Sequence, residues 1–92
     1  MDIRQALGAA LKSARMSRGL TQEDFAIVSS RTYLSTLERG IKSPTLDKLQ
    51  EISDVLGMHP LTLLSMAYMQ RDSKSASEQL DVVREELERL GA

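Results

Sequence analysis

The apolar residues of this chain recur at intervals of three and four, which is the repeat of one face of an α-helix. The first such series consists of Ile3, Leu7, Leu11 and Ala14. The same spacing returns between residues 46 and 56. No stretch alternates apolar and polar residues with the period of two that a half-buried strand needs. The spacing therefore predicts an all-α fold.

The composition predicts one small domain with an aliphatic core. The chain has 92 residues, of which 41% are apolar, and its only aromatic residues are Phe25, Tyr33 and Tyr68. The absence of cysteine excludes disulfides, thiol chemistry and cysteine-bound zinc. No apolar run is long enough for a membrane span, and no signal peptide is indicated. A cytoplasmic protein is expected.

Capping residues and glycines set the expected helix boundaries. Gly19, Gly40 and Gly57 are natural stop signals, and Thr21 with Asp24 forms a capping-box pattern. His59 precedes Pro60 and is the expected cap of the last of these helices. The expected helices span residues 3–17, 22–28, 31–39, 46–56 and 60–68.

A polar stretch separates this five-helix domain, residues 1–69, from an amphipathic tail. Residues 70–76 are expected to form a linker, although a continuous helix is an alternative. Residues 77–92 are expected to form a C-terminal helix with one apolar face, made of Leu80, Val83, Leu87 and Leu90. We expect this face to form a dimer contact, and the alternative is that it folds back on its own domain.

One face of the helix expected at residues 31–39 carries only cationic and hydroxyl side chains. About 100° of rotation per residue gathers on this face Arg31, Thr32, Ser35, Thr36 and Arg39. Leu34 and Leu37 point the opposite way. A solvated surface usually mixes Glu with Lys, whereas arginine and short hydroxyl side chains suit a helix that lies in the major groove of DNA.

The charge distribution agrees with this interpretation, although the net charge is −1. Residues 1–42 contain seven Lys or Arg and four Asp or Glu, which gives a net charge of +3. Residues 43–92 contain five and nine, which gives −4. The hydroxyl-rich helix therefore lies in a basic half of the chain, where a polyanion would be attracted.

Two stretches, "GLTQEDFA" and "SRTYLSTLERGIKSPTLDKLQEISDVLGM", resemble the lambda-repressor/Cro-like (XRE-like) helix-turn-helix family. The resemblance covers about residues 7–68. It implies that helix 31–39 reads DNA bases, chiefly with Arg31, Thr32 and Thr36, while Ser35 assists. Three more residues are implied to bind phosphates, namely Gln22, Arg39 and Lys42. An ion pair between Arg15 and Glu38 is implied to be structural.

The connection between the second and third helices departs from the family pattern. This chain has "AIVSS", residues 26–30, which is two residues shorter than usual and lacks the usual glycine. Either Ser29 or Ser30 could cap the third helix. A shift of one residue would turn the base-reading face by about 100°.

These features predict a sequence-specific transcriptional regulator that binds double-stranded DNA, without a cofactor or metal. A homodimeric repressor on a palindromic operator is expected. The alternative is a protein-interaction module on the same scaffold, such as an antitoxin or an anti-repressor partner. An enzyme is not expected, because His59 is the only histidine and the chain has neither a glycine-rich phosphate loop nor a nucleophile with a base.

Overall fold

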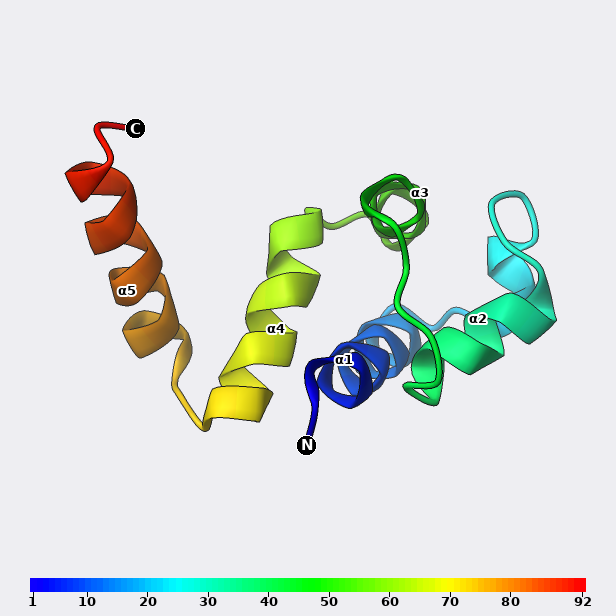
Figure 1. Cartoon of the computed structure of the whole chain (residues 1–92). Coiled ribbons are helices and arrows are strands. Elements are labelled where there is room, and N and C mark those ends of the chain that lie inside the picture. Colours follow the sequence, from blue (N-terminus) through cyan, green and yellow to red (C-terminus); the bar gives the residue numbers. More distant parts are fainter.

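The computed structural model describes all 92 residues and contains helices but no strands, as the spacing of the apolar residues predicts (Figure 1). In chain order the elements are α1 (Ile3–Ser17), the 3-10 helix η1 (Gln22–Phe25), α2 (Arg31–Glu38), α3 (Leu46–Leu56), α4 (Pro60–Asp72) and α5 (Ala76–Arg89). None of the helices is long and apolar enough to cross a lipid bilayer.

The hydrophobic core lies between α1, η1, α2, α3 and α4. α1 is the central element, with α4 packed on one side of it and α2 on the other. The main core cluster is aliphatic apart from one phenylalanine and consists of Leu11, Ala14, Phe25, Leu34, Leu37, Leu49, Ile52, Leu56 and Leu63. All elements except α5 contribute to it, so the core fixes α2 against the rest of the domain.

The backbones of α1 and α2 approach each other closely at Gly8. A Cβ atom placed on Gly8 would lie 2.4 Å from the carbonyl oxygen of Leu37 and 2.7 Å from that of Glu38. Only a residue without a side chain fits between α1 and the C-terminal turn of α2.

The second element is shorter than the expected helix of residues 22–28. It is a 3-10 helix that ends at Phe25, and residues 26–29 form a turn. The amides of Val28 and Ser29 both donate to the carbonyl of Phe25, at 2.9 Å each. The shortened connection leaves too few residues to continue a helix, so the chain turns at once.

Ser30 is the residue that caps α2. Its Oγ accepts a hydrogen bond from the amide of Tyr33 at 3.1 Å, whereas the Oγ of the buried Ser29 donates to the carbonyl of Ser30. α2 therefore begins at Arg31, as expected, and the orientation of its polar face follows from this cap.

The C-terminal part of the chain forms an arm that projects from the domain (Figure 1). α4 continues to Asp72, four residues past the expected end, and Ser73 then takes a left-handed conformation with φ 53°. Ser75 caps α5, so only three residues separate the two helices. α5 packs on α4 and has no buried residue.

We expect Gly8→Ala to destabilise the protein by about 1–3 kcal/mol, because the new methyl group would push α2 away from α1. The sign of this change in stability is informative, because a Gly→Ala substitution within a helix normally stabilises a protein by roughly 0.5–1 kcal/mol. Urea unfolding measures the difference. The control is Ala9→Gly at the next position, which should cost only the helix propensity. A Gly8→Ala protein that is more stable than the wild type would contradict the close approach.

Candidate nucleic-acid interface

A buried ion pair joins α1 to the C-terminal end of α2. Arg15 Nε lies 2.6 Å from Glu38 Oε2, and Arg15 Nη2 donates to Glu38 Oε1 at 3.0 Å. Only 12% of the Arg15 side chain and 4% of the Glu38 side chain are exposed. The hydrogen bonds to Glu38 raise the pKa of Arg15 above its ordinary value, although burial acts in the opposite direction. Glu38 therefore favours the charged form of Arg15.

The same pair also holds the two segments that lie between α1 and α2. Arg15 Nη1 donates to the carbonyl of Leu20 at 2.9 Å, which fixes the chain just before η1. Gln22 Nε2 donates to Glu38 Oε1 at 3.2 Å, which ties the first residue of η1 to α2. The position of α2 relative to η1 is thus set by one carboxylate with three donors.

An open, polar groove runs along the outer side of α2 and reaches η1. No apolar residue lines it, and its five lining residues are Gln22, Arg31, Thr32, Ser35 and Arg39. All five were singled out in the sequence as base-reading or phosphate-binding residues. A second polar hollow adjoins it at Gln22 and Arg31 and extends toward Arg15 and Thr21.

The two arginines of the groove are available to an external ligand. Arg31 is exposed, and its only partner is the equally exposed Glu23 at 3.4 Å, a contact that contributes little. Arg39 Nε donates to the carbonyl of Ser35 at 3.3 Å, and its other N–H groups have no partner in the protein. Both guanidinium groups can therefore form new bidentate contacts with a base edge or a phosphate.

Two predicted residues lie outside this groove. Thr36 is half-buried, and its hydroxyl donates to the carbonyl of Tyr33 at 2.6 Å. On the helix it is about 140° from Arg31, at the border with the side that faces the core. Lys42 is exposed in the loop that follows α2. It follows Arg39 by three residues along the chain.

One residue that supports the interface was not predicted from the sequence. Lys48, on α3, donates from Nζ to the carbonyl of Val28 in the shortened turn, and its Nζ lies 3.0 Å from Glu51. This contact satisfies a carbonyl that the short turn leaves without a backbone partner. No local pattern indicates it, because the two residues are 20 positions apart.

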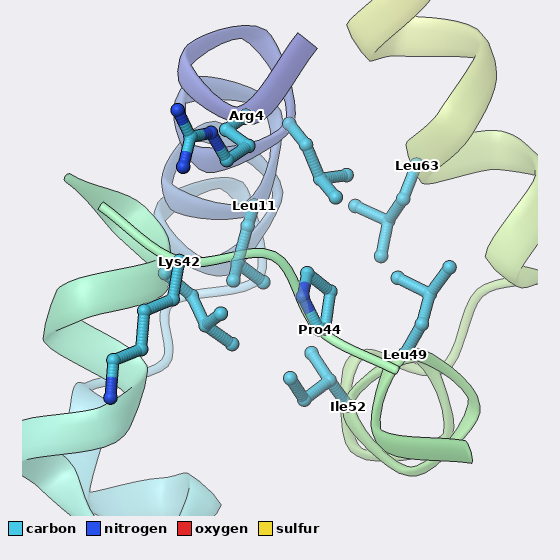
Figure 2. Close-up of a pocket in the computed structure, with 9 residues that line it drawn as sticks. Arg4, Leu11, Lys42, Pro44, Leu49, Ile52 and Leu63 are labelled. Carbon is cyan, nitrogen blue, oxygen red and sulfur yellow. The ribbon is translucent and has the colours of Figure 1, made fainter. Parts of the chain in front are cut away.

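Behind α2 lies a narrow apolar cleft between α1, α3 and α4 (Figure 2). Its walls include Leu11, Leu49, Ile52 and Leu63, which point toward one another. The space that it encloses is about that of one water molecule. The cleft is therefore part of the core packing and has no room for a small-molecule ligand.

Removal of the Glu38 carboxylate from the buried ion pair should strongly destabilise the fold. We expect Glu38→Gln to lower the free energy of unfolding by about 3–5 kcal/mol, because Arg15 would stay buried without a counter-charge. Urea unfolding monitored by circular dichroism measures the change. Glu23→Gln, which breaks the exposed pair with Arg31, is the matched control and should change stability by at most about 1 kcal/mol. Equal effects of the two substitutions would contradict the structural role of Glu38.

Comparisons with known proteins agree with this geometry. The sequence pattern of the family described as helix-turn-helix matches residues 11–63. The uncharacterized HTH-type transcriptional regulator y4dJ of Sinorhizobium fredii is 39% identical over 67 residues, which cover 71% of this chain and 87% of that protein. The control protein C.BamHI of Bacillus amyloliquefaciens is 36% identical over 66 residues, which cover 68% of this chain and 82% of that protein.

Two crystal structures of the clp gene regulator ClgR from Corynebacterium glutamicum have the same fold. They are similar to this structure with TM-scores of 0.71 and 0.69 and are 36% and 33% identical in sequence. The first similarity covers 76% of this chain and 94% of the ClgR chain, and the second covers 98% and 90%. The chain therefore belongs to the lambda-repressor/Cro-like (XRE-like) helix-turn-helix family of transcriptional regulators.

Proposed function

We propose that this protein represses transcription by binding a palindromic DNA operator as a homodimer, with α2 of each copy in the major groove. The observation that carries the proposal is the polar groove along α2, which presents two arginines and two hydroxyl groups without a carboxylate. A solvated helix face has no need of such a uniform set of donors. The major groove offers acceptors on guanine and adenine, and arginine recognises guanine with two hydrogen bonds.

The groove divides into base-reading and positioning residues. Arg31, Thr32 and Ser35 project from the N-terminal part of α2 and reach base edges, with Thr36 at the border of the contact. Gln22, Arg39 and Lys42 flank them and bind phosphates, which set the register of α2 on the duplex. Gln22 uses one amide N–H on Glu38 and keeps the second N–H for a phosphate.

The homodimer is inferred from the apolar face of α5, here called the α5 stripe, which consists of Leu80, Val83, Leu87 and Leu90. All four residues are more than one third exposed. An apolar groove between α4 and α5 continues this surface with Leu61, Leu64 and Tyr68. To read half-sites one turn of DNA apart, such a dimer has to hold its two α2 helices about 34 Å apart. Repression is the simplest result, since a bound dimer excludes other proteins from the same DNA.

The other candidate is a protein-interaction module on the same scaffold, such as an antitoxin, in which the groove between α4 and α5 would bind another protein. The residues that separate the two functions are Arg31, Arg39 and Lys42. A module that binds only protein has no use for exposed cations along α2, and two of these three residues are free of any carboxylate partner.

Selection of binding sites from a random pool of DNA duplexes at physiological salt tests the proposed function. We expect an enriched inverted repeat, because two related α2 helices read two related half-sites. The Arg31→Ala protein should then no longer distinguish the bases at one position in each half-site. This loss corresponds to roughly 1–3 kcal/mol of binding free energy between the preferred base and the others. Lys42→Ala is the control and should weaken the binding of all DNA sequences by the same factor. If no sequence is enriched by the folded protein, the protein-interaction function is favoured.

Sedimentation velocity tests the homodimer. We expect Leu87→Asp to shift the protein from dimer to monomer at micromolar concentration, because a buried unpaired carboxylate in the α5 stripe is costly. Glu85→Lys, on the opposite side of α5, is the control and should leave the dimer intact. A wild-type protein that sediments as a monomer at all accessible concentrations would rule out self-association through α5.

A further inference from the structure

Arg4 is a cation that the stability of the fold does not explain. It is the second residue of α1, where the helix dipole is positive and disfavours a cation. Arg4 is exposed, and no carboxylate lies within ion-pair distance of it. The nearby Asp2 carboxylate is engaged in capping, since it accepts the amide of Gln5 at 2.9 Å. The charge of Arg4 therefore contributes nothing evident within the protein.

The packing of α1 on α2 brings Arg4 to the end of the proposed DNA surface. Gly40, which follows Arg39, lies against the first turn of α1, so that a Cβ atom on Gly40 would be 2.8 Å from Gln5 Cα. Arg4 and Lys42 both lie at the rim of the apolar cleft. Figure 2 shows their charged ends pointing away from the apolar lining, on the side on which α2 lies. Arg4 and Lys42 thus lie near each other where the loop after α2 meets the first turn of α1.

We propose that Arg4 binds a DNA phosphate beyond the one held by Lys42, and so extends the phosphate contact from the α2 loop onto the first turn of α1. This inference rests on the proposed DNA-binding function. Arg39, Lys42 and Arg4 form no ion pair within the protein, so their charges remain available to a nucleic-acid strand. The strand presents one phosphate per roughly 3.4 Å of helix axis, so neighbouring cations match its charge.

The salt dependence of operator binding tests Arg4. We expect Arg4→Gln to reduce the slope of log K against log salt concentration by about 0.9, the value for one lost phosphate contact. If the two lines converge near 1 M salt, this corresponds to binding about fivefold weaker at 0.15 M. The order of base preferences should not change. Arg4→Lys keeps the charge and should retain a slope close to that of the wild type.

Two further variants separate the possible failures. Arg89→Gln removes the same charge from the end of α5, on the opposite side of the molecule from α2, and should leave the slope unchanged (Figure 1). If Arg4→Gln and Arg89→Gln lower the slope equally, the effect is one of net charge and the inference is wrong. If Lys42→Ala lowers the slope and Arg4→Gln does not, the inference is wrong but the proposed function stands. If none of the variants changes the slope, the inference is wrong and Lys42 binds no phosphate, whereas a folded protein that binds no operator would contradict the proposed function itself.

Discussion

The ion pair between Arg15 and Glu38 is the interaction on which the arrangement of the proposed DNA surface depends. α2 has only eight residues, too few to stay helical without support from its surroundings. Two hydrogen bonds from one guanidinium fix both the position and the rotation of the helix end that carries Glu38. The same carboxylate also accepts from Gln22, which ties η1 to α2. A pair of apolar residues could replace the charge, but it would not set the rotation of the helix in this way.

The shortened turn makes this support more important. Residues 26–29 form only a tight turn after Phe25. Lys48 on α3 supports this turn from the side, and Gly8 allows α1 to approach the other end of α2. α2 is therefore held at both ends by other elements. Its orientation therefore depends on α1 and α3 as well as on the turn and the Ser30 cap.

Most of the fold could be predicted from the sequence, because apolar spacing and helix caps are local signals. Apolar spacing, the glycine stops and the serine cap of α2 gave the boundaries of α1, α2 and α3 to within one residue. The predicted ends of η1 and α4 were wrong, for different reasons. η1 is short because the turn begins directly after it, and the spacing of apolar residues does not show where a turn begins. α4 was expected to end where the sequence becomes polar, but polarity reports exposure to water, and an exposed backbone can still be helical until Ser73 turns it.

Part of the candidate site could also be predicted, because it depends on signals that are local in the sequence. The residues that line the α2 groove share a helix face, which rotation along the helix predicts, and Ser30 fixes that rotation. Arg4 and Lys48 escaped notice because their significance comes from packing between elements far apart in the chain. Thr36 lies at the border of its face, where a helical wheel with about 100° per residue cannot separate a solvent-facing side chain from a half-buried one.

The lack of any buried residue in α5 has a thermodynamic consequence. An isolated helix of 14 residues is marginal in water, and here the cap at Ser75 and the ion pair between Asp81 and Arg84 add only small increments. The free energy that opens α5 is therefore much smaller than the free energy that unfolds the core. Any protein that covers the α5 stripe must also order the helix, so that binding and helix formation are a single coupled equilibrium. Part of the interaction energy is spent on ordering, which lowers the affinity for a given contact area.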